Sequence, residues 1–394
     1  MTKLALLGGL SAEQFLQEYW QKKPLLVRQA LPDAEGYIDA DQLAGLSLEK
    51  NVESRIIIGA DSNPKKPWQL LHGPFSDKTF RKLPTTEWTL LVQAVNFYLP
   101  QFTEILEQFD FIPQWRIDDI MVSYAAPGGS VGTHYDNYDV FLIQGQGKRQ
   151  WRIGDVCGPD TTLQKHPQLR LLKSFKHTDE WMLETGDLLY LPPRVAHYGV
   201  ALDDCLTYSV GFQAPSLPNL AEYFCNDILE RNLQDFRYSD PDLKPPSHSG
   251  LLSAEAIGRI KQLLMDTLND TPMMEDWVAR MLSEAKYDDH QPQASTALSN
   301  QQFATLLING ETLYRDEGSR FLFIESANAG LTLYINGAPY AHPQLDALVR
   351  QLCDHRVLGT KHLAAFLSSA KAIDWLHELH QLGLLYFADA ESEE

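Results

Sequence analysis

Two short motifs, far apart along this chain, can together form a metal site. The first is His134-Tyr-Asp136, and the second is His197, which lies inside GDLLYLPPRVAHYGV. Residues i and i+2 of a β-strand point to the same face, so one strand can present an imidazole and a carboxylate, and a distant strand can add the second imidazole. Two His and one carboxylate on one side of a metal are the ligand set of non-haem Fe(II) sites. The pattern therefore predicts a β-sheet scaffold that carries His134, Asp136 and His197 as metal ligands.

The residues around both motifs are typical of strands. The runs 140–144, 149–153 and 188–191 are rich in β-forming residues and are bounded by Gly, Asp or Pro. An H-x-D triplet alone is common by chance in a chain with twelve His, and its ordinary interpretation is a strand His beside a solvated Asp. The β-rich frame and the second His after a Gly-Asp turn favour the metal site.

The strand after the first motif offers a binding group for an anion. Alternation puts Arg149 on the same face as Trp151 and Ile153, and puts Lys148 on the opposite face. The Arg149 face is mostly apolar, and a guanidinium there is unfavourable unless an anion meets it. The far carboxylate of a dicarboxylate such as 2-oxoglutarate fits this requirement, while its keto-acid end chelates the iron. The alternative is a structural ion pair with an internal Asp or Glu.

Three stretches of the chain resemble the Jumonji-C (JmjC) 2-oxoglutarate oxygenases. They are FLQEYWQKKPLLVRQAL (15–31), WRIDDIMVSYAAPGGSVGTHYDNYDVFLIQGQGKRQWRIG (115–154) and LETGDLLYLPPRVAHYGVALDDCLTYSVGF (183–212). More narrowly, the chain is similar to the bacterial ribosomal oxygenases, which hydroxylate an arginine side chain of a large-subunit ribosomal protein. The resemblance extends through the Tyr238-Ser-Asp-Pro-Asp linker into the C-terminal region and covers nearly the whole chain.

The resemblance implies an enzyme that uses Fe(II), 2-oxoglutarate and O2 and acts on a ribosomal protein. It implies that His134, Asp136 and His197 bind the iron and that Arg149, where many JmjC demethylases have a lysine, binds 2-oxoglutarate. One departure from the family pattern lies on the strand before the Gly-rich loop, where a small hydroxyl residue expected near Ala125 is missing.

The arrangement of strands and helices predicts an α+β chain with three parts. By the resemblance, residues 1–215 form a JmjC double-stranded β-helix, which is a cupin-like jelly roll. Residues 216–290 have apolar residues at helical spacing and predict a helical segment. In residues 298–394 short helices alternate with strands, which suggests a winged-helix-like C-terminal domain.

The helical segment is also a candidate interface. It predicts helices at 217–236, from about Ser253, and through Trp277. Three amphipathic helices are few for an independent core, so their apolar faces require a partner surface, either the barrel or a second copy of the chain. We expect a homodimerisation segment.

Composition limits the other partners. A net charge of −19 disfavours a nucleic-acid backbone as the main partner and suits a basic protein substrate. Acidic residues also outnumber Lys and Arg from Leu298 onward, so no direct nucleic-acid binding is expected from the winged-helix region. Four widely spaced Cys fit a reducing cytoplasm, and no apolar run is long enough to span a membrane.

Several alternatives remain open at the level of sequence. A JmjC demethylase acting on a methylated protein side chain begins with the same hydrogen abstraction, and a cupin-type small-molecule dioxygenase shares the fold. A transcription factor built on the winged helix would need a basic recognition helix. Asp118, Asp119 and Asp139 could bind a substrate guanidinium, although solvated loop carboxylates are the plainer interpretation.

Overall fold

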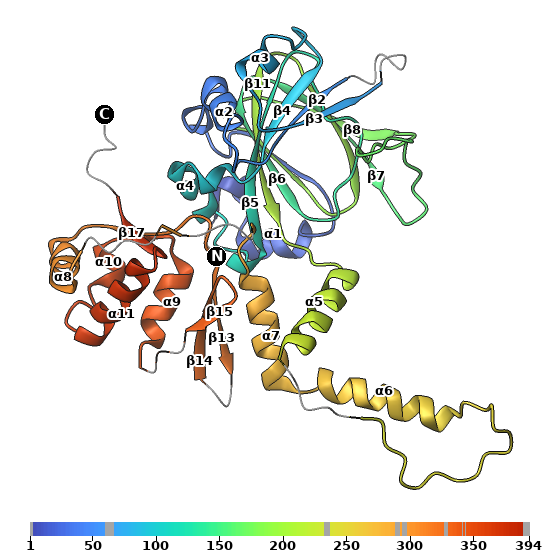
Figure 1. The fold of residues 1–394 in the computed structure, drawn as a ribbon. Coiled ribbons are helices and arrows are strands. Elements are labelled where there is room, and N and C mark those ends of the chain that lie inside the picture. Colours follow the sequence, from blue (N-terminus) through green and yellow to red (C-terminus); the bar gives the residue numbers. More distant parts are fainter. Residues whose placement is uncertain are drawn as a thin grey trace. The chain divides into compact units, whose positions relative to one another are not determined.

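The computed structural model describes residues 3–59, 67–231, 237–287, 292–293, 298–326, 330–340, 342 and 344–388 of the 394-residue chain. Its contacts divide the chain into two compact units, Met1–Ala214 and Pro215–Glu394, which Figure 1 colours from blue to green and from yellow-green to red. The expected boundaries of the helical segment, at 216–290, stay a prediction.

The first unit is built from an eight-stranded and a three-stranded antiparallel sheet. Across the large sheet the order is β1 (Leu25–Val27), β9 (Leu188–Leu191), β6 (Val140–Gln146), β11 (Cys205–Phe212), β5 (Ile117–Ala125), β4 (Trp88–Val92), β2 (Ser54–Ile58) and β3 (Gln69–His72). Across the small sheet it is β10 (Val195–Ala201), β7 (Arg149–Val156) and β8 (His177–Leu183). The expected double-stranded β-helix is confirmed.

Two central strands of the large sheet, β9 and β11, are buried along their whole length because both of their faces are covered. Every residue of β9 and of β11 is buried. One face packs on the small sheet through a shared apolar cluster. Its buried members are Val140, Leu142, Leu189 and Leu191 from the large sheet and Trp151, Ile153, Leu183 and Val195 from the small one.

The opposite face of the large sheet carries the main core. Its helices include α1 (Ala12–Glu18), α2 (Ala40–Leu46), α3 (Asp77–Phe80) and α4 (Thr103–Glu107). Helix α1 begins at a capping box in which Ser11 and Gln14 bond each other's backbone, and it buries Phe15 completely. The Phe15 ring lies 5.0 Å from that of Tyr190, centre to centre. Helices and loops thus seal this face, and the pocket described below opens on the other.

The second unit contains two three-stranded sheets and the longer helices. The sheets have the orders β16-β12-β17 and β13-β14-β15. In chain order the elements are α5 (Leu217–Glu230), α6 (Ala254–Leu268), α7 (Thr271–Ser283), α8 (Asn300–Asn309), β12 (Leu313–Arg315), β13 (Phe321–Ser326), β14 (Gly330–Ile335), β15 (Ala338–Tyr340), α9 (Asp346–Asp354), β16 (Val357–Leu358), α10 (Thr360–Leu363), α11 (Ala370–Gln381) and β17 (Leu385–Phe387).

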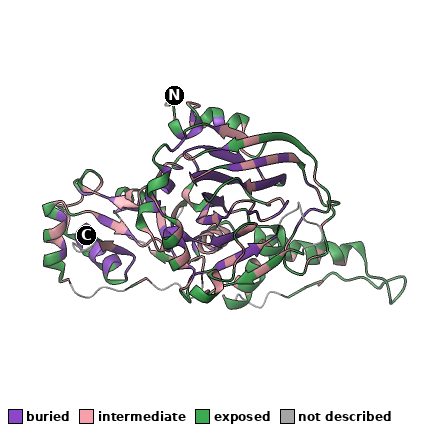
Figure 2. Ribbon diagram, turned by 90° about the horizontal axis from the view of Figure 1, so that it is seen from above, coloured by how far each residue is buried: buried purple, intermediate pink, exposed green. Residues whose placement is uncertain are grey.

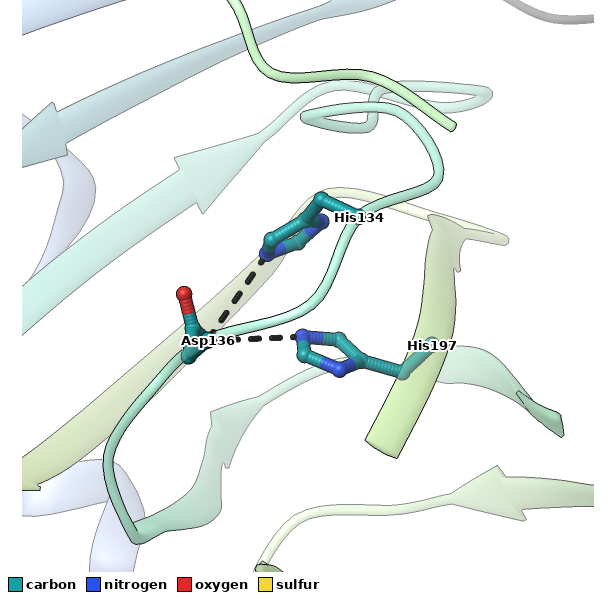
Figure 3. Close-up of side chains that lie close together, drawn as sticks. All are labelled: His134, Asp136 and His197. Atoms are coloured by element: carbon teal, nitrogen blue, oxygen red, sulfur yellow. Dashed lines mark ion pairs between the residues drawn. The ribbon is translucent and has the colours of Figure 1, made fainter. Parts of the chain in front are cut away.

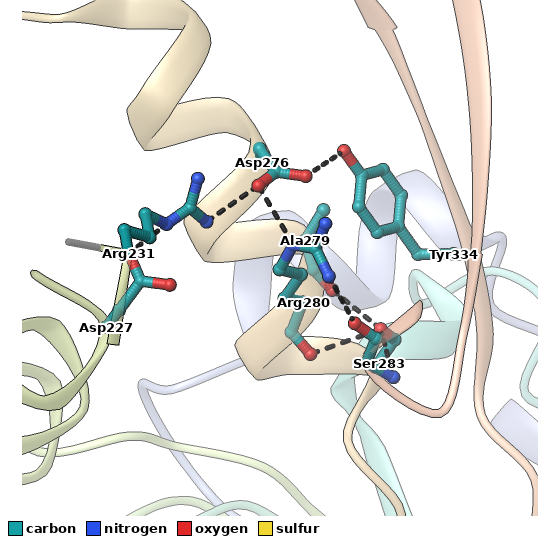
Figure 4. A network of polar contacts seen from close by, with 8 residues as sticks. Asp227, Arg231, Asp276, Ala279, Arg280, Ser283 and Tyr334 are labelled. Carbon is teal, nitrogen blue, oxygen red and sulfur yellow. Dashed lines mark hydrogen bonds and ion pairs between the residues drawn. The ribbon is translucent and has the colours of Figure 1, made fainter. Parts of the chain in front are cut away.

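Helix α7 is joined by polar contacts to both α5 and β14 (Figure 4). Asp276 on α7 accepts a 2.6 Å bond from Arg231, which follows α5, and a 2.9 Å bond from the Tyr334 hydroxyl on β14. Arg280, one turn further along α7, bonds the same carboxylate at 2.9 Å. Trp277 on α7 is buried and contacts Phe224 of α5 edge to face. These contacts pack α7 within the second unit.

Helix α6 differs from α7 because none of its residues is buried (Figure 2). Its apolar residues Ile257, Ile260, Leu264 and Leu268 recur at helical spacing and are between 43% and 64% exposed. The helix therefore presents an apolar stripe to solvent. Among the helices in the described ranges, none has the length and hydropathy that a membrane crossing requires.

Candidate metal centre

His134, Asp136 and His197 lie close together (Figure 3) and line one pocket of the first unit. Asp136 Oδ2 is 3.9 Å from His134 Nε2 and 3.6 Å from His197 Nε2. One ligand atom from each of the three residues lies within 4.8 Å of the others. In the part of the chain that the structure describes, this is the only such group of His, Cys and acidic side chains.

Both imidazoles are held by a backbone carbonyl at the ring nitrogen that faces away from Asp136. His134 Nδ1 is 2.9 Å from the Gly132 oxygen, and His197 Nδ1 is 2.9 Å from the Val195 oxygen. Each contact favours a proton on Nδ1, which leaves the Nε2 lone pair available to a metal. The two residues also bond each other's backbone in both directions, at 2.9 and 3.1 Å. The backbone therefore sets the spacing of the two rings.

The segment that carries Asp136 differs from the expected strand. His197 lies on β10, but His134 forms only an isolated bridge to it, and Asp136 lies in the connection to β6. The polar sequence Thr-His-Tyr-Asp-Asn-Tyr-Asp lacks the alternating apolar residues that would keep it in the sheet. Asp136 is instead held through its backbone oxygen, which accepts a 2.6 Å bond from the Arg194 N–H.

A small apolar cluster packs behind the ligands. Its buried members are Cys157, Leu172 and Ala196, the last of which is next to His197. Tyr135, which lies between His134 and Asp136, packs against this cluster. The Leu172 N–H donates to the Thr133 oxygen at 2.8 Å. The connection between β7 and β8 therefore packs against both segments that carry the candidate ligands.

The group fits a divalent metal ion. Ligand atoms about 2.1 Å from a metal at right angles lie about 3 Å apart, so movements of less than about 1 Å would bring these atoms to bonding distance. Burial, aided by the nearby His134, lowers the pKa of His197 to about 4, against the opposing effect of Asp136. A neutral imidazole is the form that binds metals. Two His and one carboxylate on one side suit non-haem iron.

Arg149 lies in the same pocket, and the alternation predicted for its strand is confirmed. Arg149, Trp151 and Ile153 are buried, whereas Lys148 is exposed and pairs with Glu184 at 2.8 Å. The Arg149 guanidinium donates to the hydroxyls of Thr207 at 3.0 Å and Ser123 at 3.4 Å. No carboxylate among the described residues pairs with it, so the alternative of a structural ion pair is not observed.

The surroundings of Arg149 fit a bound dicarboxylate. Arg149 is 4% exposed, and burial lowers its pKa. Arg149 Nε and the Trp151 indole N–H are buried without a hydrogen-bond partner in the described structure. Both side chains line the pocket that contains the three candidate metal ligands. Buried donors without acceptors are rare and unfavourable, and an anion in the pocket would satisfy them.

Thr207 is a contact of Arg149 that the sequence analysis missed. It pairs directly with Ser123 across β11 and β5, so both hydroxyls face the pocket. Thr207 thus adds a second small hydroxyl beside Ser123 at the Arg149 guanidinium. Only the register between two distant strands brings these residues together.

Of the three acids considered for a substrate guanidinium, the structure places Asp118 and Asp119 in the pocket and Asp139 outside it. Asp139 is completely buried and accepts bonds from Tyr190, Gln21 and Arg116 at 2.7 to 3.3 Å, and burial raises its pKa. It joins the N-terminal segment to the barrel and does not line the pocket. Asp119 lines the pocket, but its Oδ2 accepts bonds from Gln93 and the Ala94 N–H. Asp118 lines the pocket and is half-buried.

Two family models match this chain. Residues 104–220 match the JmjC domain, and residues 263–386 match the ROXA-like winged helix. The second match agrees with the expected winged-helix-like C-terminal domain.

Relatives match nearly the whole chain. The ribosomal protein uL16 3-hydroxylase of Escherichia coli (strain K12) is 34% identical over 87% of this chain and 90% of its own length. The probable ribosomal oxygenase of Haemophilus influenzae is 35% identical over 83% of this chain and 81% of its own.

Solved structures agree with these matches. The X-ray structure of E. coli YcfD has a TM-score of 0.86 at 31% identity and covers 96% of this chain and 98% of its own. A structure of YcfD in complex with cobalt and 2-oxoglutarate has a TM-score of 0.83 at 31% identity, covering 96% and 99% of the two chains. On this evidence the chain belongs to the bacterial ribosomal oxygenases of the JmjC class.

Proposed function

We propose that this protein is an Fe(II)- and 2-oxoglutarate-dependent oxygenase that hydroxylates an arginine side chain of a large-subunit ribosomal protein. One observation carries this proposal: the cluster of His134, Asp136 and His197 lines the same pocket as Arg149. Arg149 has no carboxylate partner among the described residues, and its Nε is buried without a hydrogen bond. The relative named as a uL16 3-hydroxylase and the YcfD complex with cobalt and 2-oxoglutarate support the metal, the co-substrate and the substrate class.

In the proposed mechanism His134 Nε2, Asp136 and His197 Nε2 hold the iron on one side. When bound, Fe(II) with 2-oxoglutarate and O2 supplies the oxidising chemistry, in which decarboxylation to succinate accompanies insertion of oxygen into a C–H bond. Arg149 binds the far carboxylate of 2-oxoglutarate with two charge-assisted bonds and so orients its other end toward the metal. The buried walls around Arg149 and Trp151 exclude water from the reacting groups.

The outer pocket suits a long cationic side chain. Asp118 provides a carboxylate for a guanidinium, and Met121, Tyr138 and Phe212 provide apolar surface for the aliphatic stem. Tyr138 is 42% exposed and lies at the pocket mouth. This combination supports an arginine substrate. A ribosomal protein substrate also implies that the reaction takes place in the cytoplasm.

The test is mass spectrometry of ribosomal protein uL16 after incubation with the protein, Fe(II), 2-oxoglutarate and O2. We expect a gain of one oxygen on a single arginine, one succinate formed for each hydroxylation, and no gain with the His134→Ala variant. A loss of methyl groups would identify a demethylase instead. Turnover of a small molecule with no modified ribosomal protein would favour a cupin-type dioxygenase.

We also propose that the protein is a homodimer through its helical segment. The exposed stripe of Ile257, Ile260, Leu264 and Leu268 on α6 supports this, because a helix with no buried residue gains its apolar packing only from a partner. A second copy presents the same stripe, and a twofold interface buries both.

A further inference from the structure

The inner face of the large sheet carries a row of four side chains that runs from the Arg149 contact toward the edge of the sheet. Thr207 on β11 is opposite Ser123 on β5, Ser123 is opposite Leu91 on β4, and Leu91 is opposite Arg55 on β2. Directly opposed residues of antiparallel strands point to the same face. All four residues line the pocket. The next residue of the row is exposed His72 on the edge strand β3.

Arg55 is a charged group of this pocket that the proposed mechanism does not use. Arg149 serves the co-substrate and Asp118 serves the substrate cation. Arg55 is half-buried, and its side chain has no hydrogen bond or ion pair with any part of the chain that the structure describes. A guanidinium that is partly removed from water and lacks an acceptor is an unfavourable feature of a free protein. It indicates that the acceptor comes with the ligand.

The position of Arg55 is at the outer part of the pocket. Arg55 and Tyr138 line the same pocket, and both are partly exposed, whereas Arg149 is 4% exposed. Leu91 and Ser123 separate Arg55 from Thr207 along the row. A target side chain that reaches the metal therefore leaves its own backbone nearer to Arg55 than to Arg149.

We propose that Arg55 binds a main-chain carbonyl oxygen of the substrate segment next to the target residue. This inference rests on the proposed function. The protein has a net charge of −19, which favours basic substrate segments, and such segments bring few carboxylates. Every segment brings carbonyl oxygens, and each can accept a bond from one of the five N–H donors of a guanidinium. Arg55 would then fix where the substrate backbone passes, independently of most of its side chains.

The test is the dissociation constant of uL16, measured with a redox-inert metal and 2-oxoglutarate bound to the intact protein. Arg55→Ala should weaken uL16 binding roughly ten- to a hundredfold, as expected for a lost charge-assisted bond. Arg55→Lys should recover part of the affinity. The control is Arg152→Ala, because Arg152 lies on the outer face of β7 and pairs with Glu180. The 2-oxoglutarate dissociation constant should agree within about twofold among all variants, which verifies the fold.

A second arm identifies the acceptor. In uL16 peptides whose amides are replaced one at a time by esters, which are weaker acceptors, one position should lose affinity in the wild type but not in Arg55→Ala. If replacing a substrate acid by its amide abolishes the difference between wild type and Arg55→Ala, the ligand is a side-chain carboxylate and the main-chain assignment is wrong. If Arg55→Ala and the wild type bind uL16 with equal affinity, the inference about Arg55 is wrong, and the proposed function is unaffected. Failure of the wild type to bind uL16 removes the proposed function and this inference together.

Discussion

Replacing Arg149 by Met should stabilise the free protein while it strongly weakens co-substrate binding. Arg149 is 4% exposed and has hydroxyl partners but no carboxylate. Exchanging buried charged groups for apolar side chains of similar volume is often neutral or stabilising by about 1–4 kcal/mol. The same change removes a bidentate charge-assisted bond to 2-oxoglutarate, which is worth about 2–4 kcal/mol, or about thirtyfold to a thousandfold in the dissociation constant. If Arg149 served only the fold, its replacement by Met would lower the free energy of unfolding.

The assay combines urea denaturation with calorimetric titration of 2-oxoglutarate, in the presence of a redox-inert divalent metal. Wild type should gain about 2.7 kcal/mol of unfolding free energy at a ligand concentration one hundred times the dissociation constant. At the same ligand concentration Arg149→Met should gain less than about 1 kcal/mol. Arg149→Lys should bind with intermediate affinity, because a point charge cannot reproduce the planar fork. Lys148→Ala, the matched surface control, should bind normally. Lower stability of Arg149→Met together with near-normal binding would refute the assignment.

Three further outcomes follow from the site and from α6. Leu172→Ala should destabilise the fold by about 2–4 kcal/mol and also weaken Co(II) binding, measured by titration, because Leu172 packs behind both ligand segments; unchanged metal affinity would show that this cluster does not position the ligands. Asp118→Asn should raise the KM for uL16 roughly tenfold or more and leave the 2-oxoglutarate dissociation constant unchanged; an unchanged KM would exclude Asp118 as the guanidinium partner. Light scattering should give twice the chain mass for the wild type and the monomer mass for a variant with Ile260→Asp and Leu264→Asp, whereas a monomeric wild type at micromolar concentration would remove the dimer proposal.

The sequence predicted the inward face of β7 because that inference needs only local alternation. Arg149 and Trp151 face the pocket, as the period of two requires, and Lys148 faces solvent. Helix α6 was equally predictable from the sequence, since its N-cap Ser253 and its apolar spacing are both local signals.

Features that depend on contacts between distant segments were not predictable in the same way. The pairing of Thr207 with Ser123 depends on the register of β11 against β5. The burial of Asp139 depends on Tyr190 and Gln21, which lie far away in the sequence. Short strands such as β12, β15 and β16 were also missed, because two or three residues carry no detectable period. The sequence placed His134 and Asp136 on one strand, whereas His134 forms only an isolated bridge to His197, and Asp136 follows it and accepts a backbone bond from Arg194.

The central claim is that His134, Asp136 and His197 hold one metal ion whose open side faces a co-substrate bound by Arg149. Its most direct test is a crystal structure grown with Mn(II) and 2-oxoglutarate, with anomalous diffraction measured at a wavelength at which manganese scatters anomalously. We predict one strong anomalous peak about 2.1–2.3 Å from His134 Nε2, Asp136 Oδ2 and His197 Nε2, with the far carboxylate of 2-oxoglutarate in two hydrogen bonds to Arg149. A peak at other side chains, or a 2-oxoglutarate carboxylate bound away from Arg149, would contradict the account.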